Sequence, residues 1–163
     1  MLCSNTAAMS TPHTPWRVYS THAIFHADPA PLWRVLADFN GLPALLPEMV
    51  KASSTAGQGV GAVRTLTFEG GGVAKEVLIA LHPEQFRLSY AMEDPDGFPW
   101  THYFCTQQLQ ALGAGQTHIS ITGYYQPREG TDGAAREGLS EVYAGVLTGL
   151  ARVLGAPLVP QHS

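Results

Sequence analysis

One amphipathic segment near the end of the chain constrains the fold more than any other feature. Between Asp132 and Leu154, apolar side chains recur at intervals of three and one residues, which is the spacing of one face of an α-helix. They are Leu139, Val142, Tyr143, Val146, Leu147, Leu150, Val153 and Leu154. Asp132 is suited to cap the start, and Gly155 followed by Pro157 ends the segment. A helix of this length measures about 33 Å and crosses a small domain.

Three glycines interrupt this helix, at Gly138, Gly145 and Gly149. Each weakens an isolated helix by about 1 kcal/mol relative to alanine. We therefore expect the rest of the chain to cover the apolar face and to supply the stability of the helix.

The composition favours a compact globular domain. Hydrophobic residues make up 45% of the 163 residues and charged residues only 13%, which argues against disorder. The net charge of -4 comes without any run of Lys or Arg, so we expect no nucleic-acid partner. No apolar run approaches the length of a membrane span, and the beginning of the chain lacks the pattern of a signal peptide. We expect a cytoplasmic protein without integral membrane contact.

The ends of the chain carry little pattern. Residues 1–15 are rich in Ser, Thr and Pro, which predicts a disordered leader, with Met9 as an alternative start. We expect a single domain over 16–156 and a short tail over 157–163. Cys3 and Cys105 match neither a disulfide framework nor a metal-binding spacing, so we expect two free thiols.

Between the leader and the long helix, the pattern is mainly that of strands. Trp16–His26 alternates as a strand, and two short helices follow, over Pro29–Asp38 and Pro43–Leu46. Six more strands are separated by Gly, Pro and Asp turns. They are Met49–Ala56, Gly61–Glu69, Val73–His82, Gln85–Glu93, Trp100–Leu112 and Gln116–Tyr125. This order predicts an α+β fold, in which a seven-stranded curved antiparallel sheet wraps around the C-terminal helix.

Several short motifs are similar to those of a known superfamily. The most specific are Ala27-Asp28-Pro29 with Leu32-Trp33, Asp38-Phe39-Asn40-Gly41-Leu42 leading to Pro47, and Gly59-Val60-Gly61-Ala62-Val63-Arg64-Thr65. Weaker matches are Lys75-Glu76-Val77-Leu78, Tyr90, Pro99 with Tyr103, and Gly123 with Pro127. Over Val18–Leu154 the chain thus resembles the helix-grip proteins of the START and Bet v 1 superfamily (SRPBCC), especially the small bacterial polyketide cyclase/dehydrase-like branch.

The resemblance implies a ligand pocket between the sheet and the C-terminal helix. One departure is that Leu45-Leu46 stand where many relatives have Trp-His, which makes the expected pocket mouth more apolar. Function still has to be argued from the site, because this fold hosts carriers, sensors, cyclases and lyases.

Period-two alternation predicts which charged residues point inward. Arg64 shares a face with Leu66 and Phe68, so we expect it on the apolar side of its strand. Glu76 on the neighbouring strand is its candidate partner, because a buried charge needs one. The face of Glu76 is ambiguous, since Val77 and its neighbours make the opposite face equally apolar, and a β-bulge would reconcile the two.

We expect the pocket to combine apolar side chains with a few polar groups. Glu76, Arg64 and Tyr103 are the candidate catalytic residues. The candidate ligand-binding residues are Trp33, Phe39, Leu42, Leu45, Leu46, Phe68, Tyr90, Cys105, Gln107, Ile121, Tyr125, Tyr143 and Leu147. Plain packing stays open for the tyrosines, and a purely structural ion pair for Arg64 and Glu76.

The sequence contains no motif for a metal, phosphate or cofactor site. His22 and His26 have a helical metal-ligand spacing but fall on a strand, on the face opposite Phe25, so we predict no metal site. The glycines at 70–72 lack the Lys-Ser/Thr of a phosphate loop, and neither a nucleophile elbow nor a cofactor motif occurs. We predict no cofactor.

Three hypotheses of function follow. The first is a carrier or sensor that binds a small hydrophobic or aromatic, polyketide-like or lipid-like, molecule. The second is a cofactor-free cyclase or dehydratase, with Glu76 as acid or base, Arg64 polarising a carbonyl and Tyr103 orienting it. The third is an interaction module, such as a homodimer, which an exposed apolar face on Val73, Val77 and Ile79 would favour.

Overall fold

The computed structural model describes residues 14–161, so most of the predicted leader, including Cys3 and Met9, lies outside the described residues. The elements in chain order are β1 (Arg17–Phe25), α1 (Pro29–Leu36), α2 (Leu42–Leu45), β2 (Val50–Ala56), β3 (Val63–Phe68), β4 (Val73–His82), the 3-10 turn η1 (Pro83–Gln85), β5 (Arg87–Met92), β6 (Trp100–Gly113), β7 (Gln116–Pro127), α3 (Asp132–Leu154) and β8 (Leu158–Gln161). Of the helices in this range, none has both the length and the apolar character that a membrane crossing requires.

The strands form one antiparallel sheet in the order β2-β3-β4-β5-β6-β7-β1-β8. Strands β2 to β7 follow the chain as the predicted meander, and β1 closes on β7. The sheet has eight strands, not the predicted seven, because part of the expected tail pairs with the free edge of β1, where Pro160 lies opposite Ala23. Four residues that include a proline carry no alternation, so only the tertiary partner makes β8 a strand.

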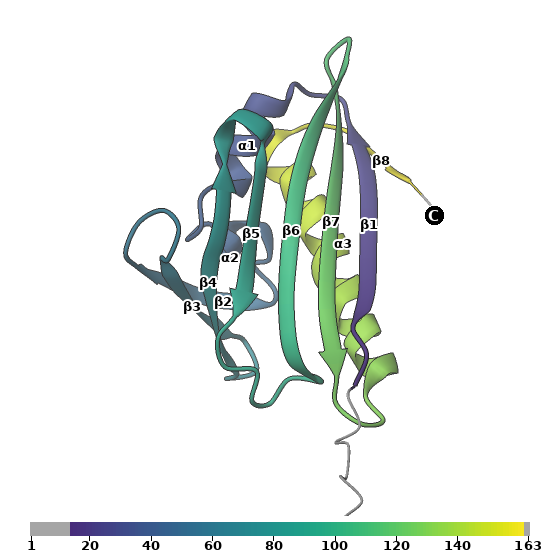
Figure 1. The fold of residues 1–163 in the computed structure, drawn as a ribbon. Helices are drawn as coiled ribbons and strands as arrows, with labels where there is room; N and C mark the ends of the chain where they lie inside the picture. Colours follow the sequence, from purple (N-terminus) through teal and green to yellow (C-terminus); the bar gives the residue numbers. More distant parts are fainter. Residues whose placement is uncertain (1–13, 162–163) are drawn as a thin grey trace, which may run out of the picture.

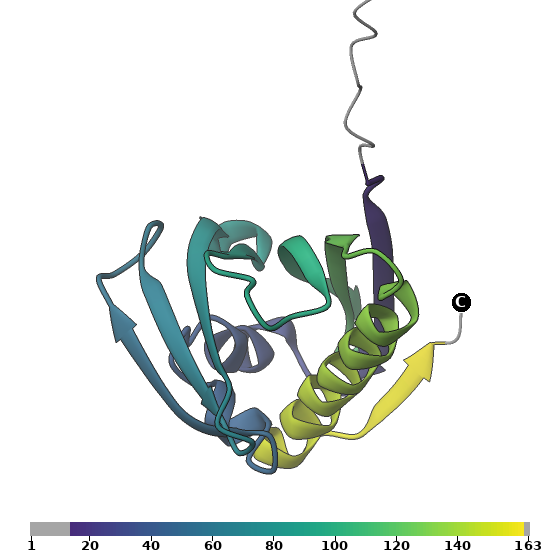
Figure 2. The ribbon, with the colours of Figure 1, turned by 90° about the horizontal axis from the view of Figure 1, so that it is seen from below.

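Helix α3 lies along the concave side of the curved sheet, as Figures 1 and 2 show from two directions. Its bounds match the predicted ones, and Gly155 ends it in the left-handed conformation with φ 59°. The N-cap is Thr131 rather than the predicted Asp132, which starts the first turn. Between Leu139 and Leu150 the predicted face is buried except at the half-buried Val142, whereas Val153 in the last turn is 44% exposed. The fold is therefore the helix-grip fold.

Two of the helix glycines are contact positions. A Cβ atom on Gly149 would lie 2.8 Å from the carbonyl carbon of Leu45. A Cβ atom on Gly145 would lie similarly close to the side chain of Leu46, the residue that follows α2. One turn beyond Gly149, Arg152 donates from Nη2 to the carbonyl of Ala44 at 2.7 Å. The glycines weaken the isolated helix, yet they allow α2 to pack directly on its backbone.

A β-bulge in β4 resolves the ambiguous face of Glu76. Ala74, Glu76 and Leu78 are buried and point inward. Immediately after Leu78 the register with β5 shifts, so that Leu81 comes to lie opposite the buried Leu88. The bulge thus brings Leu81 to the inner face, whereas Val73, before the shift, and Ile79, at the shift, lie on the outer face and are exposed.

Candidate functional site

A cavity of about 70 Å³ lies between the sheet and α3. Its polar lining groups belong to Arg64, Glu76, Tyr90, Tyr103 and the indole of Trp100. The rest of the lining is aliphatic, thioether or phenyl in character: Leu42, Leu46, Met49, Val50, Leu66, Phe68, Ala74, Met92, Phe98, Leu139, Val142 and Val146. A chamber with few polar groups in an apolar wall is typical of a small-molecule site.

Arg64 and Glu76 form a buried ion pair on the wall of this cavity. The register of β3 and β4 places the two residues opposite each other. Nε and Nη2 of Arg64 each lie 2.6 Å from Oε2 of Glu76, and the side chains are only 7% and 8% exposed. The predicted inward placement and pairing are confirmed. Removal of either partner would leave an uncompensated charge in the core.

The guanidinium of Arg64 has further contacts within the chain. Its central carbon lies 4.4 Å from the ring centre of Phe39 and 4.7 Å from that of Tyr90, within the range of cation–π attraction. Nη1 donates to the carbonyl of Phe39 at 3.3 Å. Burial lowers the pKa of Arg64, but the carboxylate of Glu76 and the phenol of Tyr90 outweigh this effect, so the pKa is raised overall. Arg64 is therefore a fixed cation.

Glu76 keeps one carboxylate oxygen for the cavity. Both of its contacts with Arg64 use Oε2, and no described residue hydrogen-bonds to Oε1. No fully enclosed side-chain nitrogen or oxygen in residues 14–161 lacks a partner, so Oε1 is open to the cavity that Glu76 lines. An accessible carboxylate oxygen in an apolar chamber can accept a hydrogen bond or a proton from a bound molecule.

Three phenols and a thiol lie close together at one side of the chamber, although only Tyr90 and Tyr103 line it. The hydroxyls of Tyr103 and Tyr143 are hydrogen-bonded at 2.9 Å, and Gly123 makes room for them, because a Cβ atom there would overlap the Tyr143 hydroxyl. Burial raises the pKa of Cys105 to about 11, and it raises the pKa values of Tyr90 and Tyr103 as well. At neutral pH these groups are protonated, so they serve as hydrogen-bond donors rather than as nucleophiles or bases.

A second cavity, of about 20 Å³, adjoins the first and shares Arg64 and Tyr90 with it. Its other polar lining residues are Asp38, in the segment between α1 and α2, and Gln107 on β6. Gln107 is buried, with 7% of its surface exposed. A space of this size holds about one water molecule or one small polar group.

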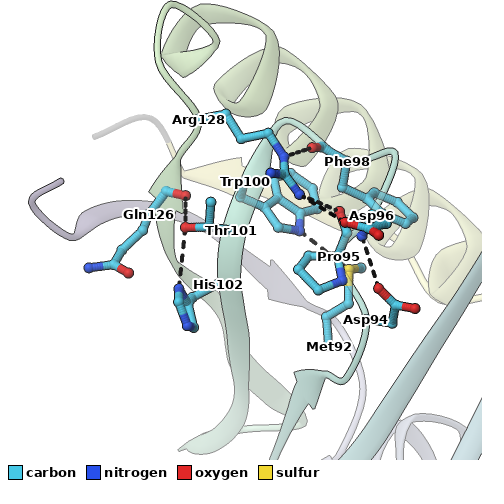
Figure 3. Close-up of polar contacts among 10 residues, drawn as sticks. All are labelled: Met92, Asp94, Pro95, Asp96, Phe98, Trp100, Thr101, His102, Gln126 and Arg128. Carbon is cyan, nitrogen blue, oxygen red and sulfur yellow. Dashed lines mark hydrogen bonds and ion pairs between the residues drawn. The ribbon is translucent and has the colours of Figure 1, made fainter.

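The loop between β5 and β6 supplies part of the wall and is held by Arg128 from the segment between β7 and α3. Figure 3 shows that Arg128 Nε donates to the carbonyl of Phe98, at 3.0 Å, and that Nη2 reaches the carbonyl of Pro95, at 3.3 Å. The indole of Trp100 contacts the sulfur of Met92 at 3.3 Å. These contacts fix two aromatic side chains and a thioether against the cavity.

Most of the predicted site residues line one of the two cavities. They are Glu76, Arg64, Tyr103, Phe39, Leu42, Leu45, Leu46, Phe68, Tyr90 and Gln107. The others line neither cavity: Trp33, Cys105, Ile121, Tyr125, Tyr143 and Leu147. Their roles in binding stay predictions.

Specific contacts explain why some predicted residues lie outside the lining. The hydroxyl of Tyr125 donates to Asp132 Oδ1 at 2.9 Å, at the start of α3. The ring of Trp33 packs edge-on against Phe86, with ring centres 6.0 Å apart. The hydroxyl of Tyr143 is engaged with a neighbouring phenol. Strand alternation for Tyr125 and helical spacing for Trp33 and Tyr143 predicted that these side chains point inward, but neither pattern distinguishes the wall of a cavity from the core behind it.

Several lining residues were missed. Alternation already placed Leu66 and Met92 on inward faces, and the α3 stripe contained Leu139, Val142 and Val146. Phe98 carried no such signal, because it lies in a loop, where it is held by the hydrogen bond from Arg128 and by ring contacts with Phe68 and Trp100.

The histidines lie away from the cavities. His22 and His118 stack on neighbouring strands with ring centres 5.3 Å apart, and burial together with the proximity of His22 lowers the pKa of His118. Within residues 14–161, no group of three or more His, Cys, Asp or Glu side chains is arranged to hold a metal ion.

The eight-stranded curved sheet, the long helix on its concave side and the cavity between them define a protein of the Bet v 1-like helix-grip class. The sequence model of the family described as "Polyketide cyclase / dehydrase and lipid transport" matches residues 15–155. The chain therefore belongs to this family.

Solved structures agree on the fold. XoxI from Bacillus cereus is 23% identical, with a TM-score of 0.74 over 83% of this chain and 94% of that one. Norcoclaurine synthase from Thalictrum flavum, in complex with dopamine and hydroxybenzaldehyde, is 20% identical, with a TM-score of 0.72 over 93% and 96% of the two chains. Ara h 8.0201 is 15% identical, with a TM-score of 0.71 over 86% and 99%. No curated protein sequence matches the chain.

Proposed function

We propose that this chain binds a small hydrophobic or aromatic molecule in the cavity between the sheet and α3. The observation that carries the proposal is the make-up of the cavity wall, which is apolar and aromatic except at Arg64, Glu76 and a few hydrogen-bond donors. Such a wall favours a guest that buries apolar surface and offers few polar groups. The family description, which names lipid transport and polyketide chemistry, and the small aromatic molecules bound in norcoclaurine synthase support the same class of ligand.

The size of the cavity implies that the wall adjusts when a ligand enters. Engineered apolar cavities of about 150 Å³ bind benzene, whereas this one measures about 70 Å³. Leu46 and Met49 line both the cavity and a surface groove of about 430 Å³ between the α2–β2 segment and α3. Because an unbranched thioether adopts many shapes, rotation of Met49 is the simplest way to enlarge the chamber towards the groove.

The test is binding of α-methylstyrene, a wholly apolar single-ring compound, measured by calorimetry and by the increase in the urea midpoint. Ala74 is buried against the cavity, so Ala74→Leu places three additional carbons in it and should abolish binding. Ala91→Leu is the matched control, because Ala91 follows the inward-facing Tyr90 on the same sheet and points to the outer face. Unchanged binding in a folded Ala74→Leu variant would place the ligand elsewhere.

A second candidate function is proton transfer without a cofactor. The observation that favours it is that Glu76 Oε1 and the side chain of Tyr103 line one cavity, so a proton acceptor and a hydrogen-bond donor can face the same bound molecule. The test is the exchange of the methyl protons of acetophenone for deuterium in D₂O, followed by NMR. Acceleration that is lost in Glu76→Gln supports an enzyme; no acceleration leaves a binding protein.

The interaction-module hypothesis has partial support on the outer face of β4. Val73 and Ile79 are 51% and 44% exposed, whereas Val77 between them is half-buried. Pairing with a second copy through this face stays a prediction, as does the cytoplasmic location.

A further inference from the structure

Gln107 is a buried residue whose side-chain amide is paired with no described residue and is not fully enclosed. On β6 it lies between Leu88 of β5 and Ile121 of β7, both of which are buried. A primary amide has two donors and one acceptor oxygen, yet no hydrogen bond joins the Gln107 side chain to any residue in 14–161. Native proteins rarely leave such a group unpaired, so an unpaired amide with an accessible face points to an external partner.

The accessible face of this amide is the 20 Å³ cavity. Every fully enclosed polar side-chain atom in the described residues has a partner, so the amide of Gln107 is open to the cavity that it lines. Arg64 lines the same space. Nε, Nη1 and Nη2 of Arg64 each use one N–H on Glu76 or on the carbonyl of Phe39. Since a guanidinium has five N–H groups, two are left for another acceptor.

The charges around the two cavities disfavour an anionic guest. Arg64 is the one cation among the described residues that line them, and Glu76 already neutralises it at 2.6 Å. The remaining charged lining residue, Asp38, is an acid. A ligand carboxylate would therefore add negative charge to a buried site without a free cation, which is strongly unfavourable in an apolar medium.

We propose that the Gln107 cavity is a subsite for the uncharged polar end, a carbonyl or hydroxyl group, of the ligand whose apolar body occupies the larger cavity. The two cavities share Leu42, Arg64, Tyr90 and Val146, so one molecule can extend from one to the other. The ligand class is thus a neutral aromatic or aliphatic ketone, phenol or alcohol, and not a fatty-acid or other carboxylate anion. This inference rests on the proposed function and specifies its ligand.

Three single-ring compounds of nearly equal shape test the subsite. Acetophenone has a carbonyl, α-methylstyrene has a methylene group in its place, and benzoate has a carboxylate. We expect acetophenone to bind the full chain at least tenfold more tightly than benzoate and about tenfold more tightly than α-methylstyrene. In Gln107→Met, an apolar replacement of similar length, the preference for acetophenone over α-methylstyrene should fall to about twofold or less.

A second readout locates the contact in the unaltered protein. The side-chain NH₂ signals of Gln107, identified by their absence in Gln107→Met, should shift when acetophenone binds and stay in place with α-methylstyrene. If Gln107→Met does not fold, the side-chain amide signals of Gln107 can be assigned through the backbone of the wild type. Their shifts and the ranking of the three ligands then still test the subsite.

Each outcome has a defined meaning. If benzoate binds as tightly as acetophenone, or if acetophenone and α-methylstyrene bind equally, the subsite proposal is overturned while the cavity remains a binding site. Equal binding would mean that the amide is satisfied by a permanent water molecule. If none of the three compounds binds, the proposed function itself fails, and the subsite fails with it.

Discussion

Breaking the Arg64–Glu76 ion pair should cost different amounts of stability, depending on which partner is replaced. Arg64→Met removes the cation and its contacts with the rings of Phe39 and Tyr90, and it leaves the Glu76 carboxylate without a partner in the core. Breaking a buried pair in this way costs about 3–5 kcal/mol of unfolding free energy. Because two aromatic contacts are lost in addition, we expect a value near about 5 kcal/mol.

The reciprocal change should be milder. Glu76→Gln keeps an oxygen that accepts from Arg64 Nε, and the guanidinium retains the two rings and the carbonyl of Phe39. The buried Arg64 cation loses its counter-charge but keeps these contacts, so we expect a smaller loss than in Arg64→Met, about 3 kcal/mol. The double variant has no unpaired charge, so it should be more stable than Arg64→Met alone, which requires a coupling energy of about 3 kcal/mol or more.

The assay is urea unfolding of the wild type, the two single variants and the double variant, followed by tryptophan fluorescence. Arg17→Met is the control, because Arg17 and Asp132 are 3.8 Å apart at the surface, with side chains 52% and 53% exposed. Exposed pairs contribute about 1 kcal/mol or less. Equal losses for the two single variants, or additive losses in the double variant, would refute the reasoning about the aromatic contacts and the buried charge.

Three further predictions concern the helix and the core. Leu147→Ala and Leu150→Ala should each lower the unfolding free energy by about 2–5 kcal/mol, since both side chains are buried against the sheet, and losses below about 0.5 kcal/mol would mean that the helix is not gripped. Gly149→Ala should lower the unfolding free energy by about 1–3 kcal/mol, because its Cβ would overlap α2. Gly138→Ala, which has open space around it, should raise the unfolding free energy by about 0.5–1 kcal/mol. Equal effects of the two changes in urea unfolding would contradict the contact between Gly149 and α2. Burial raises the pKa of Cys105 from 9.0 to about 11, so between these pH values the thiol is protonated in the folded state and ionised in the unfolded state. The stability is therefore fully present below pH 9, and it should fall by about 1.4 kcal/mol per pH unit as the pH rises towards 11. A Cys105→Val variant with the same slope between pH 9 and 10 would exclude the thiol as the source.

Local periodicity in the sequence was enough to predict the main elements. The bounds of α3 follow from the stripe and from the stop at Gly155, and the inward direction of Arg64 follows from the alternation of its strand. The bounds of the helix and the direction of Arg64 both depend on residues that are close together in the chain, because side-chain direction in a helix or strand repeats with a fixed period.

Only the tertiary structure decided the remaining features. The pairing of β4 with β3 places Glu76 opposite the buried Arg64, and the pairing of β8 depends on an edge of β1 that the sequence does not reveal. The close approach at Gly149 and the unpaired amide of Gln107 arise from segments distant in the chain. A single strand or helix carries no information on which neighbour will meet it, so the cavities and their polar groups exist only once the sheet and α3 have packed together.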